Sequence, residues 1–337
     1  MRVVIATPFV PFQASCRGRT ADILESMLRE RGFDTAVFRI PFAPRRQDTL
    51  SQMLAIRLFD VAERSDRLIA LGAPSHLLRH PEKVVWLLGA DTMHDDGSGM
   101  PEPAPWSAAY RSACRATLGE ARRIFTSSRR AKKRLQELSG TESEVLYAPP
   151  ACVERLQAGP YGDYIACMGP IAPRRRQHLA IEALRHTRSP VRLLIAGRSD
   201  SAEYLATLRS SAVEHGAGGR LTILADGISE QRGAELVAGC LAGACFPLEE
   251  ESCLCVETEM QQAAKAVIAT TDSGAPLELI QHGENGLICE PAPKAIAAAM
   301  DLLYEDREAA KKMGGAAAES ATALGMGWDH VLNRLVS

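Results

Sequence analysis

Short runs of valine, isoleucine and leucine alternate with longer amphipathic stretches along almost the whole chain, and this alternation limits the possible folds more than any other feature. The run Val84–Leu88, for example, is followed by the helical stretch Ser107–Arg122. Strands buried on both faces of a parallel sheet are continuous apolar runs, and the crossovers between them are usually helices. The pattern therefore predicts an α/β protein with parallel sheets.

The first half of the chain contains one complete set of such alternations. Gly32 and Gly140 stand directly after predicted helices, where glycine commonly takes the left-handed conformation that ends a helix. The predicted strands are Val3–Thr7, Thr35–Ile40, Arg67–Leu71, Val84–Leu88, Arg123–Thr126 and Glu144–Tyr147, and the predicted helices are Thr20–Arg31, Thr49–Arg64, Ser107–Arg122 and Arg129–Leu138.

A linker of proline and glycine follows, at Pro149-Pro150 and Gly159–Gly162, and the alternation then starts again. We therefore predict an N-terminal Rossmann-like domain over residues 1–155, a C-terminal one over 160–320, and a helical segment over 321–337 that can pack back on the first domain. Two doubly wound sheets facing each other make a cleft, and ligands bind beyond the carboxyl ends of parallel strands. The second set of predicted strands is Tyr164–Gly169, Val191–Gly197, Leu221–Asp226, Ala244–Pro247, Ala266–Asp272 and Gly286–Glu290.

Charge and composition exclude several classes of protein. The 337 residues carry 39 Lys and Arg against 41 Asp and Glu, a net charge of −2, which argues against a nucleic-acid-binding protein or a polybasic membrane protein. No apolar run approaches the roughly 18 residues of a membrane span, and the start of the chain does not have the pattern of a signal peptide. We therefore expect a cytoplasmic protein with small-molecule partners and no integral membrane span; the sequence does not indicate the oligomeric state.

Several kinds of active site are also excluded. Thr7–Phe12, after the first predicted strand, contains no glycine-rich dinucleotide fingerprint, and no Walker A, G-x-S-x-G or H-E-x-x-H motif occurs. The nine cysteines are scattered, and only Cys253 and Cys255 form a close pair. No D-x-D pair is present to hold a divalent ion against a diphosphate. We therefore expect neither a metal nor a resident cofactor.

The most informative stretch is Phe246–Glu290, FPLEEESCLCVETEMQQAAKAVIATTDSGAPLELIQHGENGLICE. Glu251 lies in a polar loop after a predicted strand, and Glu259 follows eight residues later within a predicted helix. A helix start presents unpaired N–H groups and the positive end of a dipole, which suits a phosphate. Two carboxylates placed in this way can bind different hydroxyls of one sugar nucleotide. An acidic solvated loop with ordinary glycine turns would have the same spacing, so the residues alone leave both interpretations open.

This stretch resembles the signature of glycosyltransferase family 4, retaining enzymes of the GT-B fold, whose pattern is P-S-x-x-E-G-F-G-x-x-x-x-E-A followed by G-x-P-V-I-A-T and G-x-N-G. Pro247 and Glu251 keep the P-x-x-x-E spacing, and Glu251 and Glu259 keep E-x7-E. Val267–Thr270 and Asn285-Gly286 continue in register. The resemblance implies a GT-B fold, with two Rossmann-like domains facing across a cleft.

The resemblance also implies roles for individual residues around a nucleotide-sugar donor. Glu251 would lie beside the transferred sugar, and Glu259 would bind the ribose hydroxyls. The backbone amides around Cys255 and Val256 would face the diphosphate, and Arg175 occupies the position of a lysine that neutralises it. The other positions that the resemblance places at the donor are Gly169, Gly227, Ile228, Ser252, Cys253 and Leu254.

The chain departs from the family pattern where an arginine, small glycines and a histidine are expected. Pro170 replaces the arginine, and Arg174 or Arg176 could compensate for it. Ser252 and Leu254 replace the glycines and would reshape the sugar pocket. Asp91 and His94, in the loop where relatives carry the histidine, are candidates for binding the acceptor. Arg17 and Arg19 lie on either side of Gly18, beside the predicted helix start at Thr20. Either arginine could supply the positive charge that is missing at Pro170.

The sequence therefore predicts a retaining, metal-independent glycosyltransferase that transfers a sugar from a UDP- or GDP-linked donor to an unidentified acceptor. Two other functions stay open. The departures at Pro170 and Leu254 would suit a degenerate family member that binds a sugar nucleotide or a partner without turnover. A sugar-nucleotide epimerase with the same two-domain architecture is the other alternative.

Overall fold

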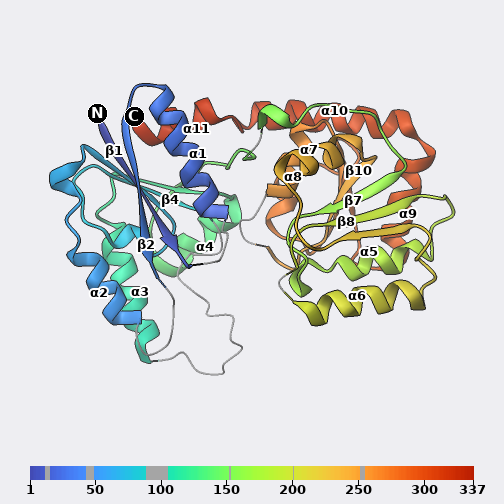
Figure 1. Cartoon of the computed structure of the whole chain (residues 1–337), viewed down its shortest axis with the longest axis horizontal. Coiled ribbons are helices and arrows are strands. Elements are labelled where there is room, and N and C mark those ends of the chain that lie inside the picture. The colour runs from blue at the N-terminus through green and yellow to red at the C-terminus, as the bar shows by residue number, and fades with distance from the viewer. Residues whose placement is uncertain (12–15, 43–48, 89–104, 152, 200, 251–254) are drawn as a thin grey trace. The chain divides into compact units, whose positions relative to one another are not determined.

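The computed structural model shows two α/β units, each built on its own six-stranded parallel sheet (Figure 1). Unit 1 consists of Met1–Ala151 and Gly327–Ser337, and unit 2 consists of Cys152–Glu250 and Leu254–Met326. The structure describes residues 1–11, 16–42, 49–88, 105–151, 153–199, 201–250 and 255–337.

The sheet of unit 1 has the strand order β2-β1-β3-β4-β5-β6. Its central strands are apolar because helices cover both faces; all five residues of β4 are buried. The strand order reverses between β1 and β3. The chain passes from β1 to β2 on one side of this point, and from β3 to β4 on the other side. The strands are β1 Arg2–Phe9, β2 Asp34–Pro41, β3 Arg67–Leu71, β4 Lys83–Leu87, β5 Arg123–Thr126 and β6 Glu144–Val145.

The helices of unit 1 include one from the far end of the sequence. Helix α11, Trp328–Val336, buries Val331 and Leu335, and the Trp328 indole donates a hydrogen bond to the carbonyl oxygen of Pro150 at 3.1 Å. The last eleven residues therefore belong to the same unit as the first 151. The other helices of this unit are α1 Cys16–Glu30, α2 Thr49–Leu58, α3 Pro105–Leu118 and α4 Arg129–Ser139, with short 3₁₀ turns at η1 Ala62–Arg64 and η2 Ser75–Leu77.

The sheet of unit 2 has the order β12-β11-β10-β7-β8-β9, with β7 and β10 at its centre. Small residues make up much of this centre: all four residues of β10, Ala-Gly-Ala-Cys, are buried, and a Cβ added to Gly243 would lie 2.7 Å from the Met260 side chain. The strands are β7 Tyr164–Met168, β8 Arg192–Ala196, β9 Leu221–Leu224, β10 Ala242–Cys245, β11 Val267–Thr270 and β12 Gly286–Cys289.

Helices cover both faces of this second sheet, and each face has its own core (Figure 1). Ile181 of α5, Leu208 of α6 and Ile296 of α9 lie in one buried cluster, whereas Val237 of α7 and Met260 of α8 lie in another. The helices are α5 Gln177–Leu184, α6 Ala202–Glu214, α7 Glu230–Gly239, α8 Cys255–Gln262, α9 Pro293–Glu305 and α10 Arg307–Ala323, and 3₁₀ turns lie at η3 Val153–Arg155, η4 Pro173–Arg175 and η5 Ala275–Glu278.

The predicted strands are confirmed in position, and their ends differ by at most two residues. Three helices differ more, and one of them, predicted over Ser107–Arg122, ends at Leu118. The helix predicted from Thr20 begins at Cys16, and the helix predicted over Thr49–Arg64 ends at Leu58. Asp60 pairs in an isolated bridge with Arg79, and this pairing interrupts the helical pattern before a separate 3₁₀ turn at Ala62–Arg64. A sequence pattern does not contain this long-range pairing.

Among the described residues, no helix is both long enough and apolar enough to cross a membrane.

Candidate functional site

Three loops follow adjacent strands of unit 2 at the carboxyl edge of its sheet. They are 169–176 after β7, 246–250 after β10 and 271–274 after β11. In an open parallel sheet this edge is where ligands bind, because the strand ends splay apart there and helix starts point toward it. Five of the residues predicted to bind the donor lie in these loops or in α8, which begins at Cys255: Gly169, Arg175, Cys255, Val256 and Glu259.

The backbone approaches itself closely at Gly169. This residue has φ +95°, and its N–H donates to the carbonyl oxygen of Ala196 at 3.0 Å. A Cβ on the neighbouring Gly197 would lie 1.8 Å from the carbonyl oxygen of Gly169, and a Cβ on Gly169 would lie 3.2 Å from Cγ2 of Val256. Only glycine fits here. The structure therefore brings Gly169 against the first turn of α8, as the predicted donor site requires.

Helix α8 has one less buried face. Cys255, Glu259 and Gln262 are partly exposed, whereas Val256 and Met260 are buried. The four-residue spacing places Cys255 and Glu259 one turn apart on the same side of the helix. Because the Val256 side chain packs into the core, only its backbone is free to face a ligand. The predicted residues Glu251, Ser252, Cys253 and Leu254 lie outside the described residues.

A buried carboxylate also lies in α8, and the sequence did not suggest a role for it. Glu257 is fully buried. Burial, together with the nearby Glu257 carboxylate, raises the pKa of the Cys245 thiol well above its usual value. Cys245 is the last residue of β10. Glu257 therefore faces the sheet, while Glu259 lies on the less buried face of the helix.

Arg175 lies in the 3₁₀ turn Pro173–Arg175 and pairs with Glu250. The distance from Arg175 Nη2 to Glu250 Oε2 is 3.4 Å, and both side chains are largely buried. The Leu248 N–H also donates to the carbonyl oxygen of Arg174 at 3.0 Å. The loop after β7 is thus attached to the loop after β10, with a cation at the predicted diphosphate position.

Arg176 binds a third loop. Its guanidinium is bidentate to the carboxylate of Asp272, at 2.7 and 2.6 Å, and Nε donates to the carbonyl oxygen of Phe246 at 2.7 Å. Arg176 is therefore engaged elsewhere and does not replace the arginine missing at Pro170. The carbonyl oxygen of Pro170 accepts from the Gln177 side chain at 2.8 Å. The sequence did not indicate a role for Asp272, whose only signal is its position two residues after the end of β11.

The predicted base-binding turn lies after β9. Gly227 has φ +83°, and Ile228 packs partly buried beside a cluster containing Leu194 and Leu236. Strand β9 ends at Leu224 rather than at Asp226, since Asp226 pairs with Arg198 in an antiparallel bridge instead. The Ile228 side chain faces this core and leaves the backbone of the turn as the available polar surface.

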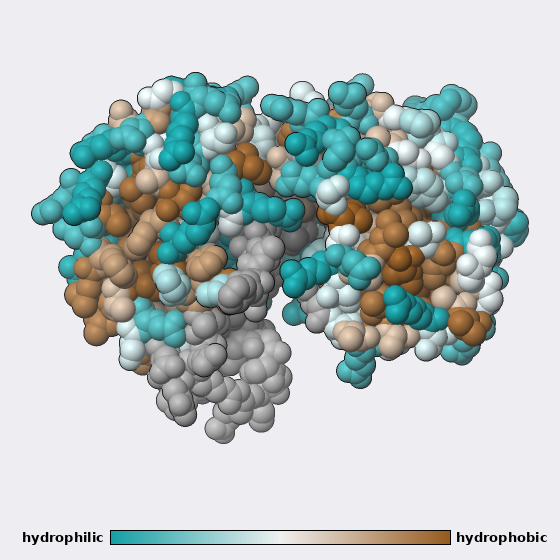
Figure 2. Space-filling view, in the orientation of Figure 1, coloured by the Kyte–Doolittle hydropathy of each residue, from teal (hydrophilic) through white to brown (hydrophobic). Residues whose placement is uncertain are grey.

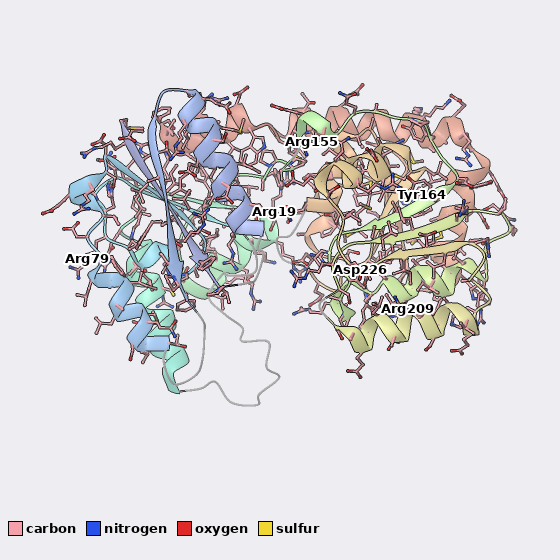
Figure 3. The ribbon with its side chains drawn as sticks, viewed as in Figure 1. Arg19, Arg79, Arg155, Tyr164, Arg209 and Asp226 are labelled. Carbon is pink, nitrogen blue, oxygen red and sulfur yellow. The ribbon has the colours of Figure 1, made fainter. Side chains whose placement is uncertain are left out.

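The prediction that a loop precedes a helix start at Thr20 is wrong. Arg17, Gly18 and Arg19 lie inside the first turn of α1, not before it (Figure 3). No proline interrupts this stretch, and Thr20 and Ala21 are buried, so packing extends the helix through Gly18 despite the weak helix propensity of glycine. Arg17 Nη1 donates to the carbonyl oxygen of Ala73 at 3.4 Å. The predicted acceptor residues Asp91 and His94 lie outside the described residues.

Within the part of the chain that the structure describes, no group of three or more His, Cys, Asp and Glu side chains is placed to hold a metal ion. Burial raises the pKa of Cys167 and of Cys240 to about 12, so both are protonated thiols at neutral pH.

Comparison with known families identifies the domain that contains this edge. A family model described as "Glycosyl transferases group 1" matches residues 157–320. Residues 157–320 of this chain are therefore similar to group 1 glycosyl transferases. The resemblance stated from the sequence is confirmed at this level, and the finer assignment to family 4 stays a prediction.

Part of the chain is also similar to a curated protein. Alpha-1,3/1,6-mannosyltransferase ALG2 of Dictyostelium discoideum is 31% identical over 118 residues, which are 35% of this chain. The alignment spans only 27% of that relative's own length.

Solved structures are similar to the chain over its whole length. Anabaena Alr3699/HepE, solved in complex with UDP and glucose, covers 99% of this chain and 100% of its own, with a TM-score of 0.72 and 15% identity. Sucrose-phosphate synthase from Thermosynechococcus elongatus covers 99% of this chain and 96% of its own, with a TM-score of 0.78 and 15% identity. At this identity the likeness shows the fold alone, and it confirms the predicted GT-B fold.

Proposed function

We propose that the chain is a retaining, metal-independent glycosyltransferase that uses a UDP- or GDP-linked sugar. The observation that carries the proposal is the convergence at the carboxyl edge of the unit 2 sheet: Gly169 touches the start of α8, and Arg175 lies in the adjoining loop. A cation and the N–H groups of a helix start at one edge are suited to a diphosphate. The group 1 domain and the UDP in the HepE complex support this choice of ligand.

The reaction needs charge stabilisation more than acid–base chemistry. The bond between the anomeric carbon and the diphosphate oxygen breaks, and both electrons leave on the diphosphate. The acceptor hydroxyl oxygen bonds to the same carbon, and its proton leaves with the nucleoside diphosphate. Arg175 and the amides of Cys255 and Val256 would stabilise the developing charge. Glu259 would hold the ribose, and Glu251 would orient the sugar.

A panel of UDP, GDP, ADP and dTDP in a thermal-shift assay tests the donor site first. Nucleotide release from the matching sugar donors then tests turnover, with and without EDTA.

Arg175→Ala should lower kcat by about 10²–10³-fold, as expected for the loss of one transition-state donor. Arg209→Ala, at an exposed position on α6, is the matched control. Glu251→Ala should leave the fold intact and abolish transfer; full turnover by that variant would refute the role of Glu251.

A second function has one observation in its favour. Pro170 carries no cation, and the Arg175 guanidinium already faces the Glu250 carboxylate at 3.4 Å. We propose, as the alternative, a family member that binds a sugar nucleotide without transferring its sugar. Nucleotide binding in the thermal-shift panel without nucleotide release, even with diverse acceptors present, would favour this alternative.

A further inference from the structure

Arg176 has an unusual backbone conformation for an arginine. Its φ of 50° and ψ of 38° place it in the left-handed region, between the 3₁₀ turn Pro173–Arg175 and helix α5. This region favours glycine, and another residue stays there only when the surrounding structure holds it. The contacts of the Arg176 side chain supply that restraint.

The Arg176 guanidinium contacts two other loops of the same sheet edge. It is bidentate to Asp272, at 2.6 and 2.7 Å. It also donates to the carbonyl oxygens of Phe246 at 2.7 Å and Pro247 at 3.1 Å, and to the Thr270 hydroxyl at 3.1 Å. Each nitrogen atom of the guanidinium thus has an acceptor on β11 or on the loops that follow β10 and β11. Lysine, with a single ammonium group, cannot reproduce this arrangement.

The segment 246–250 is also attached to the loop after β11 by its backbone. The N–H groups of Glu249 and Glu250 donate to the carbonyl oxygens of Asp272 and Ser273 at 2.9 and 3.1 Å. The Ala275 N–H donates to the carbonyl oxygen of Glu250 at 2.8 Å. The two loops are so close that a Cβ on Gly274 would lie 2.4 Å from the Glu250 carbonyl oxygen. The Arg176 side chain therefore closes a small network formed by three strand ends.

This network lies at the edge of the sheet. The side chains of Arg176 and Asp272 are 14% and 31% exposed, so the guanidinium is largely buried while the carboxylate keeps some contact with water. Hydrogen bonds from Arg176 hold the pKa of Asp272 below its usual value, so the pair stays charged at neutral pH. What the pair does determine is the position of the segment that leads from β10 toward α8.

We propose that Arg176 and Asp272 are a positioning pair that orders segment 246–250 for binding of the nucleotide-sugar donor, without touching the donor. The inference rests on the proposed function. Without the pair, the loop after β10 would become ordered only when the donor binds. The conformational entropy lost in that ordering would weaken donor binding.

The test compares Arg176→Lys, Arg176→Gly and Asp272→Asn in the full chain. The glycine variant is suited to φ +50° and removes the guanidinium, so it separates backbone strain from positioning. Arg176→Gly and Asp272→Asn should each raise the donor KM about tenfold with kcat nearly unchanged, and Arg176→Lys, which keeps the positive charge, should raise it less. The amides of Glu249 and Glu250 should exchange hydrogen at least tenfold faster. Arg192→Ala, which removes an exposed pair with Asp163 at 4.0 Å on the same sheet, is the control.

The outcomes separate the inference from the function on which it rests. A wild-type protein that binds no nucleotide and uses no donor would refute the proposed function, while amide exchange still tests the pair. Donor KM and amide exchange like those of the wild type in all three variants would overturn the pair. An equal loss of thermal stability in the lysine, glycine and asparagine variants, with no separate change in KM, would also overturn it, because the role would then be structural only.

Discussion

At the scale of single residues, three consecutive arginines have three different environments. Arg174 is exposed, Arg175 pairs with Glu250, and Arg176 binds Asp272. The left-handed backbone at Arg176 turns its side chain away from its neighbours, so adjacent residues of one type serve different purposes. In unit 1, Lys83 is a comparable case, since it is a charged side chain that is completely buried.

The buried Lys83 ammonium donates its hydrogen bonds to protein oxygen atoms instead of to water. Its ammonium donates to the carbonyl oxygens of His76 at 2.9 Å, Leu78 at 3.1 Å and Thr117 at 2.9 Å, and lies 3.2 Å from the Glu120 carboxylate. Lys83→Met should lower the free energy of unfolding of unit 1 by about 3 kcal/mol, because these acceptors become buried and unpaired. Urea unfolding measures the change.

The control for Lys83 is Arg122→Met, at a largely exposed arginine whose Nη2 lies 2.6 Å from Glu82 Oε1. It should change the free energy of unfolding by less than about 1 kcal/mol, as exposed ion pairs usually do. Equal effects of the two substitutions would contradict the role assigned to the buried ammonium.

His76 makes the stability of unit 1 depend on pH. Burial, with the nearby Lys83 charge, lowers the pKa of His76 from 6.5 to about 3. Between these values the unfolded chain binds a proton that the folded protein does not, so His76 contributes stability above pH 6.5 that is lost as the pH falls toward 3. The loss should reach about 1.4 kcal/mol per pH unit.

Urea unfolding followed by tryptophan fluorescence between pH 7 and pH 4 measures this dependence. His76→Gln should reduce the slope, whereas His330→Gln, at an exposed position on α11, should leave it unchanged. A slope that is the same in wild type and His76→Gln would contradict the assignment.

At the scale of elements, α2 has apolar residues on two faces, of which only one is covered. Met53 and Ile56 are buried, whereas Leu50, Leu54 and Leu58, spaced four residues apart, are exposed. Figure 2 shows apolar side chains gathered on the surface over this helix. Apolar periodicity alone does not tell the two faces apart, because both follow helical spacing.

The two faces of α2 predict different mutational effects. Ile56→Ala should lower the free energy of unfolding by about 2–5 kcal/mol, because it leaves a cavity in the core. Leu54→Ala, two residues away on the exposed face, should change it by less than about 0.5 kcal/mol. Chemical denaturation of the pair measures the difference, and a loss at Leu54 as large as at Ile56 would show that this face is covered in solution.

At the scale of the whole molecule, each unit has its own core, and the tryptophans are unevenly distributed. All three, Trp86, Trp106 and Trp328, fall in the residue ranges of unit 1. Tryptophan fluorescence therefore follows the unfolding of unit 1, while calorimetry follows both units. A two-unit protein of this kind is not expected to unfold in a single two-state step.

A bound nucleotide should separate the two transitions. If unit 2 holds the donor, UDP or GDP at 100 times its Kd should stabilise that unit by about 2.7 kcal/mol. The calorimetric transition that is silent in tryptophan fluorescence should then move to higher temperature, while the fluorescence transition moves less. Equal shifts by both methods would contradict a donor site confined to unit 2.

The sequence alone was enough to determine the two sheets and the edge where a ligand should bind. Apolar runs such as Val84–Leu88 and Val267–Thr270 specify buried parallel strands because a strand covered on both faces tolerates few polar residues. The roles of Gly169 and Arg175 were predicted from the resemblance to the glycosyltransferase pattern in their own stretch of sequence. These features are local, so a short stretch of sequence contains the physical information.

Only the tertiary structure decided how charged residues are used. The pairing of Arg176 with Asp272, the burial of Lys83 and Glu257, and the start of α1 at Cys16 depend on segments far apart in the chain. The helix or strand propensity of a charged residue is the same whether its side chain faces water or a partner. Burial of the charge, in contrast, changes its free energy by several kcal/mol. Which partner a charged side chain meets is set by the packing of the strands, and that is why the sequence predicts a site at this edge but not the network of ion pairs around it.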